Sequence, residues 1–211
     1  TADNVANAWT ITGADAGTVT GVGGGFTNIA NLNGGTNTDS FTLSGGTLSG
    51  AINGGLTGIN TLTADNVANT WTISGANSGT VTGVAGGFSN IGNLTGGSNN
   101  DTFSLGASGS VSGLIDGGAQ ATGDSVNYAL VTAPVTTKIG TNIANIETVT
   151  GDGVNDTLLG ADVANTWTLP GAPAGSVGGV TFSGFSNLTG GSATDSFSLS
   201  GGTLSGALNG G

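Results

Sequence analysis

The groups able to do chemistry in this 211-residue chain are almost all carboxylates. It carries eleven Asp, the single glutamate Glu147 and one cation, Lys138, with no Arg, His, Cys or Met. Without His or Cys, the chain lacks the usual bases and nucleophiles that work near neutral pH. Carboxylates without cations are instead typical ligands of hard ions such as Ca²⁺. The sequence therefore predicts a protein that is not an enzyme and whose one candidate cofactor is calcium.

Three of the aspartates occupy the same place in a recurring segment. The segments GGTNTDSFTL (34–43), GGSNNDTFSL (96–105) and GGSATDSFSL (190–199) share the pattern Gly-Gly-x-x-x-Asp-x-Phe-x-Leu. This pattern resembles the RTX (haemolysin-type) nonapeptide, in which a glycine-rich turn with an aspartate precedes a short strand. The resemblance implies a parallel β-roll with Ca²⁺ held between turns on the same edge. The resemblance covers the spacing of turns and strands over most of the chain. The glycine at the fourth position of the family's motif is replaced here by Asn37, Asn99 and Ala193.

A calcium site needs six to eight oxygen ligands, so two successive turns on one edge must both contribute. Asp101 is the turn aspartate with acidic neighbours one expected coil further on, at Asp116 and Asp124. We therefore predict one calcium site formed by Asp101, Asp116 and Asp124. In the alternative interpretation these side chains accept hydrogen bonds from their own turn amides, as in Asx-turns. The sequence leaves both interpretations open.

Composition excludes several classes of partner. The formal charge is −11, and one cation cannot neutralise a nucleic-acid backbone or favour an anionic membrane surface. We therefore expect no nucleic-acid binding. No run approaches 18 apolar residues, so we expect no membrane insertion either. The acidic, cysteine-free composition and the ADNVANTWT style of repeat look like those of large bacterial surface adhesins. That resemblance implies an extracellular or cell-surface location.

Internal repetition is the strongest pattern in the sequence. The segment TADNVANAWT (1–10) returns as TADNVANTWT (63–72) and, more loosely, as ADVANTWTL (161–169). A unit of about 62 residues that occurs nearly three times is typical of stacked-repeat architectures. We treat the chain, 1–211, as a single continuous domain. Its expected parts are repeats at 1–62, 63–118 and 161–211 and a non-repeating insertion at 119–160.

Within each repeat, short runs such as Phe41-Thr42-Leu43 alternate large apolar with small hydroxyl residues between Gly-Gly pairs. Period-two alternation predicts half-buried strands, and frequent Gly excludes helices. The prediction is an all-β fold, a parallel β-solenoid (β-roll or β-helix) of roughly ten stacked coils, three to a repeat. Each strand would pair in parallel with the next coil.

Aromatic residues that recur between repeats form the predicted core, whereas Tyr128, in the insertion, is expected to be exposed. The expected core sets are Trp9, Trp71 and Trp167; Phe41, Phe103 and Phe197; and Phe26, Phe88 and Phe185.

These features predict a structural extracellular protein, a segment or subunit of a bacterial surface fibre, adhesin stalk or filament. Neither end of the sequence shows a polar cap, so its expected partner is itself, stacked head to tail or continued as a longer repeat array. The alternative is a binding module, either an adhesive carbohydrate or receptor contact in the insertion or an ice-binding face. For ice, Thr-x-Thr segments at 70–72 and 148–150 are expected only every third coil, which would interrupt a threonine ladder.

Overall fold

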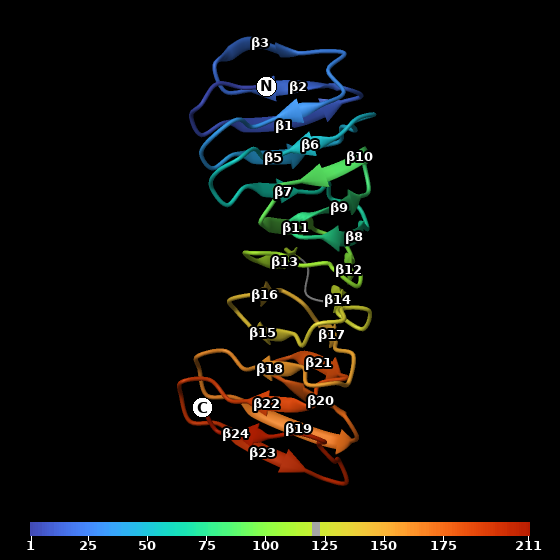
Figure 1. Ribbon diagram of the computed structural model, residues 1–211, viewed down its shortest axis with the longest axis vertical. Helices are drawn as coiled ribbons and strands as arrows, with labels where there is room; N and C mark the ends of the chain where they lie inside the picture. The colour runs from blue at the N-terminus through green and yellow to red at the C-terminus, as the bar shows by residue number, and fades with distance from the viewer. Residues whose placement is uncertain (120–122) are drawn as a thin grey trace.

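The computed structural model describes residues 1–119 and 123–211, and these form strands and turns without any helix. Residues 120–122, inside the predicted insertion, lie outside the described part. The strands run across the long axis of an elongated molecule, and the chain advances from β1–β3 at one end to β23 and β24 at the other (Figure 1). The all-β prediction is confirmed.

The strands form three sheets. The 8-stranded sheet contains, in order, β16 (Ile143–Ala144), β13 (Ile115–Gly118), β11 (Asn93–Gly97), β7 (Thr61–Thr63), β5 (Ser40–Leu43), β1 (Ala8–Gly13), β2 (Ala16–Val19) and β3 (Val22–Phe26). The 12-stranded sheet contains β23 (Ser196–Leu199), β19 (Thr166–Gly171), β20 (Ala174–Val177), β21 (Val180–Ser183), β17 (Thr148–Thr150), β14 (Ser125–Asn127), β12 (Thr102–Leu105), β8 (Thr70–Gly75), β9 (Ser78–Val81), β10 (Val84–Ser89), β6 (Ile52–Asn53) and β4 (Leu32–Asn33). The 4-stranded sheet contains β15 (Thr136–Lys138), β18 (Thr157–Leu159), β22 (Asn187–Thr189) and β24 (Leu208–Asn209).

Parallel pairing joins strands that are distant in sequence, as predicted. On β1, β5 and β7, Trp9 is the register partner of Phe41, which in turn faces Leu62. The same register aligns Trp71 with Phe103 in the second repeat. Because the register aligns large apolar residues, each strand buries its side chains against those of its neighbours.

The prediction of purely parallel pairing is wrong at one place in each repeat. There the chain makes an antiparallel three-stranded meander, formed by β1–β2–β3, β8–β9–β10 and β19–β20–β21. The turn between β8 and β9 contains Asn77 at φ 51°, and the next turn contains Gly83 at φ 86°. Short turns with residues at positive φ suit antiparallel hairpins, because their twist matches that of the strands. On β9, a Cβ on Gly79 would overlap the carbonyl oxygen of Thr72, so this pairing requires glycine.

The first two repeats place their tryptophans on different sheets. Trp9 lies in the 8-stranded sheet, whereas Trp71 and Trp167 lie in the 12-stranded sheet. Between β1 and β8 the chain passes through β4, β5, β6 and β7, changing sheet at each step. Because the number of crossings is odd, the tryptophan strand of the second repeat lies in the opposite sheet from that of the first. The expectation of three full coils per repeat, with all tryptophans in one position, is therefore wrong for the first repeat.

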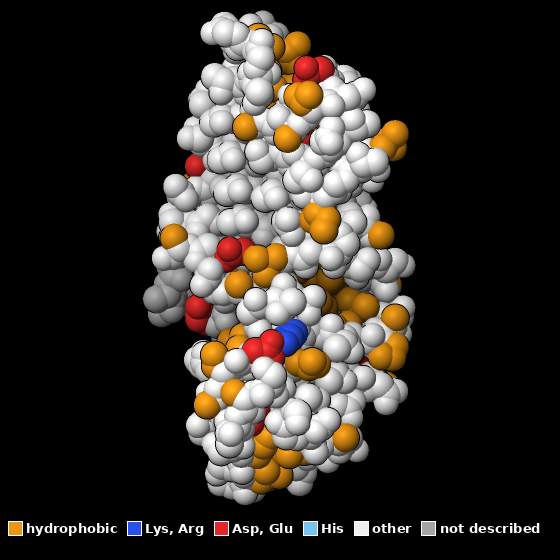
Figure 2. All heavy atoms as spheres, turned by 90° about the vertical axis from the view of Figure 1, so that its left-hand side faces the viewer, with side chains coloured by type: hydrophobic (Ala, Val, Ile, Leu, Met, Phe, Trp, Pro, Cys, Tyr) orange, Lys and Arg blue, Asp and Glu red, His pale blue; other side chains and the backbone are white. Residues whose placement is uncertain are grey.

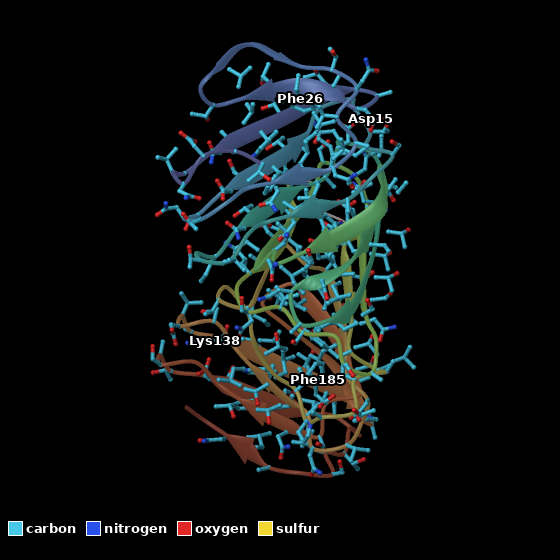
Figure 3. The ribbon with its side chains drawn as sticks, turned by 45° about the horizontal axis from the view of Figure 1, so that its top comes forward. Asp15, Phe26, Lys138 and Phe185 are labelled. Carbon is cyan, nitrogen blue, oxygen red and sulfur yellow. The ribbon has the colours of Figure 1, made fainter. Side chains whose placement is uncertain are left out.

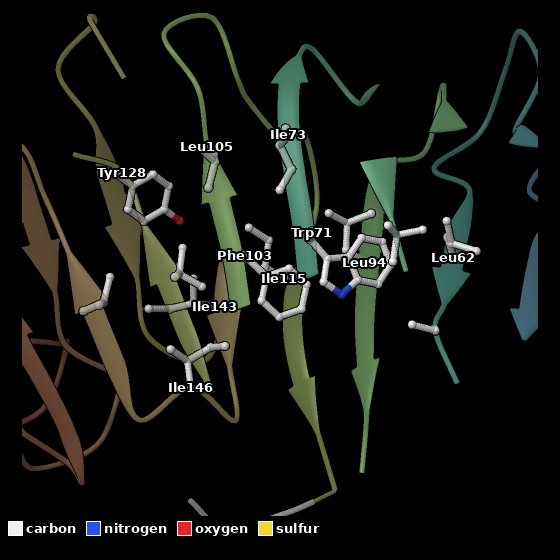
Figure 4. Packing of buried hydrophobic residues seen from close by; sticks show 14 of the residues in the cluster. Leu62, Trp71, Ile73, Leu94, Phe103, Leu105, Ile115, Tyr128, Ile143 and Ile146 are labelled. Carbon is white, nitrogen blue, oxygen red and sulfur yellow. The ribbon is translucent and has the colours of Figure 1, made fainter. Parts of the chain in front are cut away.

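The core is one continuous cluster of buried apolar side chains. Trp71 stacks on Phe103 with ring centroids 5.3 Å apart, and equivalent stacks join Trp9 to Phe41 and Trp167 to Phe197. Figure 4 shows Trp71 and Phe103 among side chains that include Leu94 and Ile115 of the 8-stranded sheet. Such offset aromatic pairs add to the stabilisation from apolar burial. The Trp and first Phe sets of the predicted core are thus confirmed as packed pairs.

Two core predictions need correction. Phe182, rather than Phe185, packs edge-on against Trp167, as Phe26 and Phe88 do against the tryptophans of their repeats. The third repeat has the segment GVTFSGFSN (179–187) where the second has GVAGGFSN (83–90), so it contains an additional phenylalanine, Phe182. Phe182 lies on β21, where it is the register partner of Gly175 on β20. Phe185 is nevertheless fully buried, so its predicted place in the core is confirmed. Tyr128 is only 7% exposed, because its ring enters the core beside Thr137.

We predict that Phe103→Ala lowers the free energy of unfolding by about 3–5 kcal/mol, because it removes a fully buried ring and leaves a cavity. Phe197→Ala is the matched control, since Phe197 makes the same stack but lies half-buried on the edge strand β23. It should cost less than half as much in denaturant unfolding. Equal losses for the two variants would contradict the assignment of β23 as an edge.

Candidate functional site

The structure brings together two of the three predicted calcium ligands. Asp101 and Asp124 immediately precede the neighbouring parallel strands β12 and β14, and the backbone N–H of Asp101 donates to Oδ1 of Asp124 at 2.6 Å. Asp116 instead lies on β13 in the 8-stranded sheet. Its Oδ1 accepts hydrogen bonds from the Gly118 N–H and the Asn145 side-chain amide.

Asp101 and Asp124 belong to a set of hydrogen bonds that we call the strand-entry ladder. In each bond, the N–H of the residue just before a parallel strand donates to the side chain of the equivalent residue on the next strand, 21 to 32 residues further along the chain. The bonds join Asn7 to Asp39, Asp39 to Asn60, Asn69 to Asp101, Asp101 to Asp124, Asp124 to Glu147, Val135 to Asp156, and Asn165 to Asp195, at 2.6–2.9 Å.

The ladder explains why the motif DNVAN recurs. The Asn69 side-chain amide donates to the carbonyls of Asp65, Val67 and Gly96 and to Oδ1 of Asp101, at 2.7–2.9 Å. Asn7 makes the corresponding bonds in the first repeat. This side chain therefore both closes its own turn and joins it to the next strand. Sequence reasoning missed this role, although an asparagine always placed two residues before the tryptophan was a usable signal.

The ladder also explains the glycine pair of the Gly-Gly-x-x-x-Asp pattern. A Cβ on Gly96 would overlap both Oδ2 of Asp101 and the carbonyl oxygen of Gly117. Gly34 makes the same room beside Asp39. The first glycine is therefore required because the carboxylate, five residues later, folds back over it. This packing accounts for the spacing without a bound ion.

Burial raises the pKa of Asp101, and the hydrogen bonds from the Asn69 side chain and backbone only partly oppose this effect. Its side chain is fully buried, and its Oδ2 has no hydrogen-bond partner among the residues that the structure describes. Burial likewise raises the pKa of Asp156, against the N–H groups of Val135 and Asp152. At Asp195, burial acts in the same direction, but the bonds from Asn165 and Gly191 outweigh it and leave the pKa lowered.

The carboxylates as placed do not fit a calcium cage. Calcium needs several oxygens converging from successive turns, whereas Asp116 faces away in another sheet and the ladder carboxylates accept backbone N–H groups. Within residues 1–119 and 123–211, no group of three acidic side chains is placed to hold a metal ion. Of the three predicted ligands, the Asx-turn alternative holds for Asp116, whose Oδ1 accepts the N–H of Gly118 two residues on. Asp101 and Asp124 instead accept N–H groups from the preceding layer. The alternative also holds for Asp195, whose Oδ2 accepts the Gly191 N–H of its own turn. Calcium binding itself stays a prediction, decided by melting with calcium or a chelator.

Hydroxyl side chains form two continuous columns on the 12-stranded sheet. Five consecutive parallel strands, β8, β12, β14, β17 and β21, contribute one residue to each column. The columns are Thr70, Thr102, Ser125, Thr148 and Thr181, and Thr72, Ser104, Asn127, Thr150 and Ser183. Every member is exposed or half-buried. Of these five strands, only β8 and β17 carry a Thr-x-Thr pair, so the expected interruption of a pure threonine ladder is confirmed on this face. Serine and one asparagine occupy the positions between the threonines.

A cavity of about 370 Å³ lies where the insertion meets the second repeat. Its lining is mostly apolar and includes Leu105, Val111, Ile115, Tyr128, Val131 and Pro134. Figure 2 shows hydrophobic side chains at the floor of a hollow beside the single blue side chain, Lys138.

Lys138 forms an ion pair with Asp162 at 2.6 Å, and the hydrogen bond from Lys138 contributes most to lowering the Asp162 pKa.

No family model, curated protein or solved structure matches this chain. Among the described residues, no helix is long and apolar enough to cross a membrane. The site must therefore be interpreted from its own geometry.

We predict that Asp101→Asn raises the free energy of unfolding at pH 7 by about 1 kcal/mol, or a few degrees in Tm. The amide oxygen can still accept the Asn69 bonds, while the amide N–H₂ can donate to the Gly117 carbonyl. Asn60 shows this arrangement already, since it accepts the Asp39 N–H and donates to the Asn90 carbonyl.

The pH dependence has a definite sign. Because folding raises the Asp101 pKa, its contribution favours the folded state at low pH and is lost as pH rises from the unfolded value, near 3.8, through the folded value. Asp101→Asn should remove that loss in urea titrations across this window. Asn60→Asp is the reverse control and should destabilise at pH 7. A destabilised Asp101→Asn with a stabilised Asn60→Asp would contradict the account.

Proposed function

We propose that this chain is a structural β-solenoid, a segment or subunit of a bacterial extracellular fibre, adhesin stalk or filament. The observation that carries the proposal is the continuity of the stack. One apolar core and the paired strands run from β1 to β23 and β24, and the strand-entry ladder adds side-chain bonds between neighbouring parallel strands. Such nearest-neighbour stacking is typical of extended repeat proteins. Roughly ten stacked coils remain part of this proposal, with an antiparallel meander once in each repeat.

The roles of the carboxylates support a scaffold rather than an enzyme. Asp39, Asp101 and Asp124 are fully or almost fully buried and accept backbone N–H groups, so they present no acid–base pair to a substrate groove. A catalytic pair needs access to the reacting atoms. The surface location, and the RTX-like and adhesin-like character, belong to the same proposal and rest on the repeat pattern and the acidic, cysteine-free composition.

A binding module is the second candidate, and two observations favour it. The paired hydroxyl columns form a regular, uncharged face that could order water, as ice binding requires. The cavity beside the insertion provides a concave apolar site of ordinary ligand size for an adhesive contact. Thermal hysteresis with shaped ice crystals would support the first form. Loss of ligand binding when 119–160 is deleted, with fibres intact, would support the second.

We predict that antibodies against this chain label thin filaments at regular intervals in electron micrographs of the native bacterial surface material. The physical reason is that a stacked-strand segment propagates along its own axis. Pre-immune serum is the control. Labelling confined to the cell interior, or to dispersed particles without a filament, would contradict the structural role.

A further inference from the structure

We propose that the β24 edge of one copy pairs in parallel with the β3 edge of a second copy, in the register that β6 and β10 already use inside the chain. The proposal rests on the structural function above and names the surface and partner through which such a fibre would grow.

The internal junction between β6 and β10 shows the bonds that such a contact needs. Phe88 is the register partner of Ile52, and Ser89 is that of Asn53, with a further parallel bridge between Leu48 and Val84. Backbone bonds of 2.8–2.9 Å complete the junction. In each bond a backbone N–H donates to a backbone carbonyl oxygen. The donor and acceptor residues are Leu48 and Gly83, Ala85 and Leu48, Gly86 and Gly50, and Gly54 and Ser89.

Both halves of this junction recur at the two ends of the structure. The first half, GGTLSGAIN (45–53), returns as GGTLSGALN (201–209), and the second half, GVAGGFSN (83–90), occurs earlier as GVGGGFTN (21–28). At the C-terminal end, β24 pairs with β22 alone among the described strands, as β6 would pair only with β4 if β10 were absent. At the N-terminal end, β3 pairs with β2, and no other strand of residues 1–119 and 123–211 pairs with its second edge (Figure 1).

The end segments already have the conformation of the internal junction. Asn28 and Asn90 have φ values of 59° and 56°, and Gly21 and Gly83 have values of 82° and 86°. Asn209 accepts the N–H of Gly211, just as Asn53 accepts the N–H of Gly55. Pairing would therefore require little rearrangement at either edge.

Apolar exposure marks the same two edges. Val22 is 51% exposed and Leu208 is 42% exposed, whereas their internal counterparts Val84 and Ile52 are 3% and 0% exposed. Phe26 is also only half-buried, and Figure 3 shows it near the N-terminal end. Burying such surface is favourable. Residues 16–28 and 201–209 contain no charged side chain, so the contact would bury no unpaired side-chain charge despite the net charge of −11.

The register predicts defined partners across the new contact. Phe26 would face Leu208 of the second copy, Thr27 would face Asn209, and Val22 would face Leu204. The two edges differ, so the contact is heterologous and does not close on itself. Repetition therefore generates a filament rather than a symmetric dimer.

Cysteine pairs test the register, because the chain has no cysteine of its own. Equal amounts of Thr27→Cys and Asn209→Cys protein are mixed at high concentration and treated with a short bis-maleimide. Register partners lie on adjacent strands about 4.8 Å apart, within reach of this reagent. The internal variant Ser89→Cys with Asn53→Cys calibrates the yield, since those residues are register partners. Thr203→Cys, six residues from Asn209 and exposed, is the out-of-register control.

We expect the Thr27 and Asn209 mixture to give covalent dimer at a yield close to the internal pair. Thr27→Cys alone, and its mixture with Thr203→Cys, should give at least tenfold less covalent dimer. Dominant dimer from Thr27→Cys alone would indicate an edge paired with its own copy and overturn the proposal. Equal yields in all mixtures, or no dimer while the internal pair reacts, would overturn it as well.

A second measurement does not depend on cross-linking. Val22→Asp should weaken concentration-dependent association at least tenfold in sedimentation experiments, because it places a charge at the contact. Leu56→Asp is the matched control, since Leu56 is 88% exposed away from the two edges and should leave association unchanged. Unchanged association in Val22→Asp would contradict the proposal. If antibodies label surface filaments but cross-linking fails, this contact is contradicted and the structural function is not. If cross-linking is efficient but no such filaments are labelled, the structural function is contradicted and the contact is not.

Discussion

The constraint on which the rest of the structure depends is the satisfaction of one backbone N–H group at the entry to seven strands, β1, β5, β8, β12, β14, β15 and β19. Where the chain turns into a parallel strand, this group is buried and points along the stack rather than toward a strand carbonyl. An unpaired buried N–H costs about 1–3 kcal/mol, so a side chain of the next layer must accept it. Asp101 does so for Asn69, and Asp124 does so for Asp101. The acceptor must be placed at a fixed point, and Asp or Asn fills this place in every ladder bond except the one from Asp124, which Glu147 accepts.

This requirement links features of the sequence that otherwise look separate. The glycine of each Gly-Gly pair leaves room for the carboxylate, and the asparagine of DNVAN closes its turn while reaching the next layer. The tryptophan two residues after that asparagine then enters the core beside its phenylalanine. In these bonds the few acidic residues stabilise the contact between neighbouring layers. Burial in this position accounts for the raised pKa of Asp101.

The repeat, the all-β class and the Trp–Phe core could be predicted from sequence, because period-two patterning and recurrence report directly on burial. The meanders could not, since the two-residue turn at Asn77 reads as one more glycine-rich turn until pairing is known. Asp101 and Asp124 were correctly expected to be neighbours. Asp116 was not separable from them in sequence, because its assignment to the opposite sheet depends on how often the chain crosses between sheets. Tyr128 looked exposed because no repeat position predicts burial within the insertion.

The most direct test of the strand-entry ladder is hydrogen exchange of the Asn69 and Asp101 amides, measured residue by residue by NMR. Both N–H groups donate only to buried side-chain oxygens in the next layer, and no sheet ladder protects them. The account predicts that they exchange as slowly as the amide of Phe103 within β12. Exchange at the rate of exposed turn amides, with Phe103 still protected, would contradict it, because the layers would then be held together without the ladder.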